Sequence, residues 1–150
     1  MTEQELAQKF EENNITLASI PKRMIAFFID ELIASVFIFI IFYDLLNSIS
    51  TEDDIVYVIN YLTPYVLALK IAYQTFFVWM YGATPGKMVV KIKVIYMYTI
   101  ENPNIMLSVI RACVRLISET FFYVGFIWAF FNPKKQTWQD YAAKTLVVNA

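Results

Sequence analysis

The sequence predicts a small, all-α, multi-pass membrane protein that forms one domain. Of its 150 residues, 59% are hydrophobic and 17% aromatic, whereas a soluble domain is usually about 45–50% apolar. The mean hydropathy is +0.52. Long apolar segments at about residues 24–46, 57–81 and 107–131 carry charged side chains inside them. Charges at such depth in a membrane face protein or water rather than lipid.

The first segment is long enough to cross a bilayer as a helix, because about 20 residues at roughly 1.5 Å each span the hydrocarbon core. Asp30 and Glu31 lie inside it. Arg23 precedes Asp30 by two helical turns and shares its face, so we expect Asp30 to pair with Arg23 or Arg111. Glu31 points about 100° away from Asp30 and needs a different partner.

The charges around the first segment predict its orientation. Residues 1–20 are polar and are predicted to form a solvated cytoplasmic segment in which Leu6 is exposed. Lys22 and Arg23 follow them, whereas residues 44–56 contain acids but no Lys or Arg. The positive-inside rule therefore places the N-terminus in the cytoplasm and this first loop outside.

The second segment, residues 57–81, predicts another full span. Tyr57 at one end and Trp79 at the other fit the aromatic belts of the membrane interfaces. Lys70 falls near the middle, where it must pair with an acid or be neutral. Glu119 is the first candidate partner, and Asp30 or Glu31 is the second.

The second loop, residues 82–106, predicts a turn followed by a strand. Gly82, Pro85 and Gly86 favour a tight turn. Lys87 follows them without the spacing or the Ser/Thr of a phosphate-binding loop. Apolar side chains then alternate with Lys91 and Lys93, which is typical of a half-exposed strand. These lysines place the loop in the cytoplasm.

The third segment, residues 107–131, is too short for two full crossings of about 20 residues each. Arg111, Arg115 and Glu119 share one face of its first half. We favour a re-entrant segment that bends near residues 120–125. A second strand-like run, residues 145–148, would then join the first in a small cytoplasmic β-hairpin-like element. The alternative is a third full span, which would put the tail outside.

Several of these features together resemble the RDD family of bacterial membrane proteins, named for one arginine and two aspartates. They are Arg23 and Asp30 in the first segment, the run Gly82-Ala83-Thr84-Pro85-Gly86-Lys87, and the run from Asp140 to Val148. The resemblance covers about residues 20–149, with residues 21–150 as the membrane domain. It aligns Arg23, Asp30 and Asp140 with the name-giving positions and Arg111 with a further arginine. Lys144 departs from the family, which tends to have glycine there.

The resemblance implies a multi-pass protein of the bacterial inner (cytoplasmic) membrane. Most members are uncharacterised, and some relatives are implied to exchange sodium or other monovalent cations for protons. The candidate ion and proton pathway residues are Arg23, Asp30, Glu31, Lys70, Arg111, Arg115, Glu119 and Asp140. In this interpretation Arg23, Asp30 and Asp140 form a unit at the cytoplasmic mouth, to which Arg111 adds a second positive charge.

A structural interpretation of the same charges stays open. Opposite charges can pair between helices and hold a small bundle together. The chain would then be a non-catalytic assembly or interaction subunit. In the transport interpretation we expect a homo-oligomer or a partner membrane protein, because three helices alone enclose no pathway, and Na⁺, K⁺ or Li⁺ with H⁺ as the ions.

The remaining composition argues against other classes of function. The chain has no His and a single Cys, which weakens a metal site or a Ser/Cys–His hydrolase. No hydrolase, nucleotide or metal motif occurs in the sequence. We therefore expect no enzyme activity, no cofactor and no metal. The net charge of −1 gives no indication of nucleic-acid binding.

Overall fold

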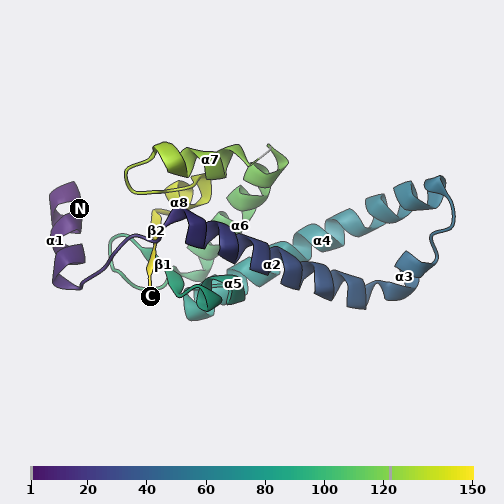
Figure 1. Ribbon diagram of the computed structural model, residues 1–150, viewed down its shortest axis with the longest axis horizontal. Coiled ribbons are helices and arrows are strands. Elements are labelled where there is room, and N and C mark those ends of the chain that lie inside the picture. Colours follow the sequence, from purple (N-terminus) through teal and green to yellow (C-terminus); the bar gives the residue numbers. More distant parts are fainter. Residues whose placement is uncertain (1, 122) are drawn as a thin grey trace.

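The computed structural model describes residues 2–121 and 123–150 and is mostly helical (Figure 1). Two helices dominate its length, α2 (Ile20–Ile41) and α4 (Glu52–Tyr81). Their most apolar 18-residue windows have mean hydropathies of 2.4 and 1.5, so both are long and apolar enough to cross a membrane. The two predicted full spans are therefore present as candidate spans.

The residues at the first turn of each helix explain why both helices begin earlier than predicted. Pro21 stands in the first turn of α2, where a proline costs no intrahelical hydrogen bond. Thr51 caps α4 through a capping box with Asp54, and acids in a first turn suit the helix dipole. At its other end α2 stops before Phe42, and the short helix α3 (Tyr43–Asn47) follows.

The third apolar segment is two helices with a bend between them. These are α6 (Ile105–Thr120) and α7 (Val124–Phe131). Tyr123 has a φ of 61°, a left-handed conformation that ends regular helix. The bend therefore falls where the sequence predicted it, and α7 runs back toward the end of the molecule that holds both termini (Figure 1).

The two strand-like runs do pair. Strands β1 (Ile92–Tyr96) and β2 (Thr145–Asn149) form an antiparallel sheet in which Val94 lies opposite Val147. The pairing is not a hairpin, because α6, α7 and α8 (Trp138–Ala143) lie between the strands in the sequence. A bridge from Leu17 to Val148 adds the N-terminal segment to the same end.

The core lies on both faces of this small sheet. On one face Ile92, Val94 and Val147 pack with Ala26 of α2 and Val78 of α4. This contact fixes the sheet against the two long helices.

On the other face Leu6 of helix α1 (Glu3–Glu12) packs with Ile95, Leu146 and Val148. The prediction that Leu6 is exposed is therefore wrong. The apolar side chains of the N-terminal segment cover a sheet face that would otherwise be open.

Two tight conformations connect these elements. Gly82 ends α4 with a φ of 70°, and its carbonyl accepts a 2.7 Å hydrogen bond from Val94 N–H. The short helix α5 (Pro85–Val89) follows. Lys144 ends α8 with a φ of 51°, a position that favours glycine.

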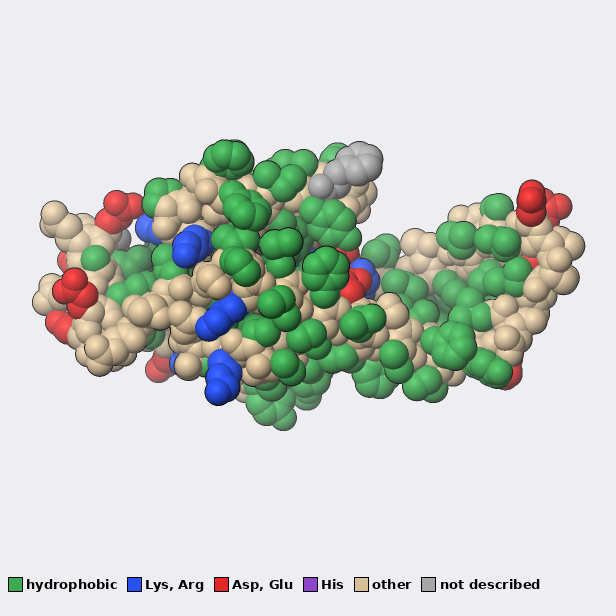
Figure 2. Space-filling model, in the orientation of Figure 1, with side chains coloured by type: hydrophobic (Ala, Val, Ile, Leu, Met, Phe, Trp, Pro, Cys, Tyr) green, Lys and Arg blue, Asp and Glu red, His purple; other side chains and the backbone are tan. Residues whose placement is uncertain are grey.

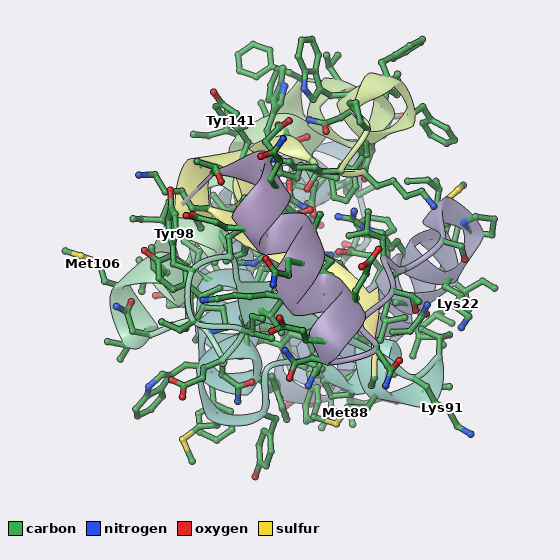
Figure 3. All side chains as sticks on the ribbon, turned by 90° about the vertical axis from the view of Figure 1, so that its left-hand side faces the viewer. Lys22, Met88, Lys91, Tyr98, Met106 and Tyr141 are labelled. Atoms are coloured by element: carbon green, nitrogen blue, oxygen red, sulfur yellow. The ribbon has the colours of Figure 1, made fainter. Side chains whose placement is uncertain are left out.

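Charged side chains are concentrated at particular places on the face that Figure 2 shows. Figure 2 shows Lys and Arg side chains over the half that contains the sheet, and hydrophobic side chains along the protruding parts of α2 and α4. Acidic side chains occupy the far tip. Viewed from the sheet end, Lys22 and Lys91 point outward (Figure 3).

Candidate functional site

Four ionisable side chains from three helices form what we call the charge quartet: Glu31, Lys70, Arg115 and Glu119. The Lys70 Nζ lies 3.1 Å from Glu31 Oε2 and 3.1 Å from Glu119 Oε2. Arg115 lies 3.2 Å from Glu31 Oε1 and 3.0 Å from Glu119 Oε1. Each cation thus bridges both carboxylates, and the formal charges sum to zero. Glu119, the first candidate partner of Lys70, and Glu31, one of the two second candidates, are confirmed, whereas Asp30 has other partners.

The helices that supply the quartet explain its geometry. Arg115 and Glu119 are one helical turn apart on α6, so they point the same way. Because α6 packs along α4, Arg115 and Glu119 face the part of α4 that carries Lys70. A small cavity of 30 Å³ beside the quartet is lined by Gln74 as well as by the four members of the quartet. It is large enough for a water molecule, which needs a cavity of about 10–15 Å³ or more.

Asp30 sits one residue from the quartet but has a separate set of partners. Its carboxylate accepts hydrogen bonds from Tyr73 Oη at 2.9 Å, Thr84 Oγ1 at 2.6 Å and the Gly86 N–H at 2.8 Å. The predicted pairing with Arg23 or Arg111 is wrong. The turn that opens α5 brings its donors to the buried carboxylate instead, as hydrogen bonds to a buried charge require.

Gly86 is required for this approach. A Cβ at this position would lie 2.2 Å from the Ala26 carbonyl oxygen and 2.8 Å from the Asp30 Cγ. The first contact is with backbone, and the second is with a carboxylate that three hydrogen bonds hold in place. The glycine therefore allows α5 to lie directly against α2 and to close over Asp30.

Asp140 is held by two arginines. Arg23 of α2 and Arg111 of α6 both pair with its carboxylate, which is fully buried. Thr137 donates from its N–H at 3.1 Å and from its hydroxyl at 3.0 Å. Burial alone would raise the pKa of Asp140, but the two arginines and the Thr137 donors hold that pKa well below its ordinary value.

The predicted unit of Arg23, Asp30 and Asp140 is thus only partly assembled. Arg23 and Asp140 meet, and Arg111 adds the second positive charge as expected. Asp30 belongs to the turn of α5 instead. The eight predicted pathway residues therefore divide into the charge quartet, the Asp140 cluster and the Asp30 turn.

Sequence reasoning missed several side chains at these sites. Tyr73 and Thr84 bind Asp30, and neither hydroxyl stands out in its segment. Lys87 was assigned only to a turn, but it is half-buried and lines the larger cavity described next. The one available signal was the run around Gly86, whose glycine marks a close approach of backbone.

A larger cavity of 380 Å³ lies between α2 and α7. Its charged lining comes from Arg23, Asp30, Lys87, Arg111 and Arg115. Its apolar lining includes Phe27 and Phe126, and the Arg115 guanidinium lies 4.9 Å from the centre of the Phe27 ring. Gln74 lines both this cavity and the small one beside the quartet. The two cavities are therefore neighbours.

Comparison with known proteins identifies the family of the chain. The sequence model of the RDD family matches residues 17–144. The chain therefore belongs to the RDD family. No curated protein and no solved structure matches it. Family membership and the two apolar helices support a membrane protein, and the family gives it no clear function.

Proposed function

We propose that the chain is a multi-pass protein of the bacterial inner membrane, with both termini and the second loop in the cytoplasm. The sheet brings the N-terminal segment, the second loop and the tail to one end, and Lys and Arg gather over that half (Figure 2). Such a bias is typical of the cytoplasmic side. In this orientation α6 and α7 form the re-entrant segment, which enters and returns without crossing.

We further propose that the charge quartet exchanges a monovalent cation for a proton. The observation that carries this proposal is the position of the Lys70 Nζ, 3.1 Å from one oxygen of Glu31 and 3.1 Å from one oxygen of Glu119. Those two oxygens converge on a single point. A Na⁺, K⁺ or Li⁺ ion binds such carboxylate oxygens and competes with the ammonium for them.

The charge balance defines the exchange. When Lys70 is protonated, the quartet is neutral without a bound ion. A cation that takes the place of the ammonium leaves a neutral quartet only if Lys70 releases its proton. Arg115 keeps its charge throughout, because a guanidinium does not deprotonate in proteins. The exchange is therefore one cation for one proton.

The route to the quartet follows the two neighbouring cavities. The larger cavity lies beside Arg23 and Lys87, near the proposed cytoplasmic end, and the smaller one beside Lys70. Gln74 lies between them and offers an amide oxygen to a passing cation. Access from the opposite side would need a rearrangement or a second copy of the chain, which agrees with the expected homo-oligomer.

A second candidate function is an assembly or interaction subunit of the membrane without transport. The observation in its favour is that the quartet is fully paired and neutral as it stands. Ion pairs of this kind can serve to hold helices together. This function requires that the quartet never change its protonation.

Proteoliposomes with an internal pH dye test the exchange proposal. A gradient of Na⁺, K⁺ or Li⁺ should drive proton movement with the wild-type protein. Lys70→Arg keeps the positive charge but cannot release a proton, so it should fold and abolish the movement. Lys93→Arg, on the exposed edge of β1, is the matched control and should behave as wild type.

Two outcomes would count against exchange at the quartet. If no cation-driven proton movement is seen at any pH from about 6 to 9, a range that brackets a raised carboxylate pKa, the assembly function is left. Full activity of Lys70→Arg would show that the proton is carried elsewhere.

A further inference from the structure

The lining of the 380 Å³ cavity between α2 and α7 combines charged and apolar side chains. Arg23, Lys87, Arg111 and Arg115 supply positive charge, and Asp30 supplies a negative one. Met24 and Ile127, two of the apolar side chains, are about half exposed on the outer surface of α2 and α7. The cavity therefore joins a buried positive region to a surface that would face lipid.

The lining of the cavity carries more positive than negative charge. Arg23 and Arg111 form ion pairs with Asp140, and Arg115 forms ion pairs with the two glutamates of the quartet. Within residues 2–121 and 123–150, the Lys87 ammonium has no ion pair. Burial first, and then repulsion by Arg111 and Arg115, lowers the pKa of Lys87 to about 7, although Asp30 and Asp140 oppose this shift.

Gln139 supplies an independent sign of a ligand. Its side chain lines the same cavity and is only 5% exposed. Its Oε1 atom is buried without a hydrogen-bond partner among the described residues. An unsatisfied buried acceptor is costly, so the cavity suits a ligand that carries a hydrogen-bond donor as well as a negative charge.

We propose that this cavity binds the headgroup of an anionic phospholipid that bears a hydroxyl group, of the phosphatidylglycerol kind. The phosphate would lie by Lys87 and Arg111, and a headgroup hydroxyl would donate to Gln139 Oε1. The acyl chains would follow the apolar side chains of α2 and α7. Basic pockets between membrane helices on the cytoplasmic side suit such headgroups.

The depth of the cavity agrees with a lipid from the bilayer. Ile20 and Arg23, at the first turn of α2, line it. This is the level at which the proposed span leaves the headgroup region. The inference rests on the proposed membrane location and is independent of ion exchange.

Native mass spectrometry of the full chain in a neutral detergent tests the inference. The wild type should retain phosphatidylglycerol about tenfold better than phosphatidylcholine of the same acyl chains. Both lipids carry the phosphate, but choline adds a positive charge that the cationic side chains of the cavity repel, and it offers no hydroxyl to Gln139 Oε1. Lys87→Gln should lower this preference, because it removes one of the positive charges that favour the anionic headgroup over the zwitterionic one. Lys93→Gln, on the exposed side of β1, should keep the preference in full.

A second comparison addresses the hydroxyl. The wild type should prefer phosphatidylglycerol to phosphatidylmethanol, an anionic lipid without a headgroup hydroxyl, and Gln139→Leu should abolish that difference. Equal retention of phosphatidylglycerol and phosphatidylcholine, or an unchanged preference in Lys87→Gln, would overturn the inference. Equally tight binding of free glycerol phosphate would replace it with a soluble-anion site. No ion gradient is involved, so each result is separate from the exchange assay.

Discussion

At the residue scale, two buried aspartates are satisfied in different ways. Asp140 is neutralised by Arg23 and Arg111, whereas Asp30 receives three uncharged donors from Tyr73, Thr84 and Gly86. Removing one partner of a buried pair typically costs about 3–5 kcal/mol. We therefore expect Asp140 to hold α8 against α2 and α6, and Asp30 to hold α5 against α2.

Lys87 gives a prediction about pH at the same scale. In the folded protein its pKa is lowered to about 7 by burial and by the nearby arginines, whereas an unfolded lysine titrates near about 10.4. Between these values the unfolded chain binds the additional proton, so this lysine makes stability rise with pH. At pH 7 and below, the full cost of its buried charge is present.

Thermal unfolding in detergent without added phospholipid checks this prediction. Between pH of about 7 and about 10, the Tm of the wild type should rise relative to that of Lys87→Met. Lys93→Met, at an exposed position of β1, should follow the wild type. Parallel curves for the wild type and Lys87→Met would contradict the lowered pKa.

At the element scale, the C-terminal end of α8 holds a non-glycine residue in a left-handed conformation. Lys144 has a φ of 51° and a ψ of 48°, and its ammonium lies 5.8 Å from the centre of the Tyr98 ring. A Cβ in this conformation costs about 1 kcal/mol. The glycine that the family tends to have here fits the conformation without that cost.

Replacing this lysine should stabilise the protein. Lys144→Gly should raise the free energy of unfolding by about 1 kcal/mol, less the small loss of contact with Tyr98. Lys144→Ala also loses that contact but keeps the Cβ, so it is the matched control and should not be stabilised. Equal effects of the two substitutions in thermal unfolding would refute the conformational argument.

The elements were largely predictable from sequence, and the contacts between them were less so. Apolar length predicted α2 and α4, and alternation predicted the strands, because both signals are local. The bend near Tyr123 followed from a segment too short to cross twice. Asp30 was predicted to pair with Arg23 because helical spacing puts the two side chains on one face of a helix. The spacing does not show which hydrogen-bond donors another element places against that face. The donors of α5 come from more than 50 residues away.

At the scale of the whole molecule, the sheet constrains the membrane topology. It joins the second loop to the tail, and the Leu17–Val148 bridge joins the N-terminal segment to them. If the loop is cytoplasmic, all three must be. The prediction of a re-entrant third segment depends on this pairing.

Labelling with a membrane-impermeant maleimide in intact cells checks the topology. In a Cys113→Ser background, Ser50→Cys, in the first loop, should react from outside. Ala150→Cys, at the exposed residue that follows β2, should react only after permeabilisation. Strong labelling of Ala150→Cys in intact cells would mean that the tail is outside and that the third segment crosses the membrane.

The central claim, that a monovalent cation replaces the Lys70 ammonium between Glu31 and Glu119, is tested most directly by proton release from the purified protein. Sodium chloride is added to the protein in weakly buffered detergent with a pH indicator, and choline chloride controls for ionic strength. The account predicts about one proton released per bound cation for the wild type, none for Lys70→Arg, and the wild-type value for Lys93→Arg. No release from the wild type, or undiminished release from Lys70→Arg, would contradict it.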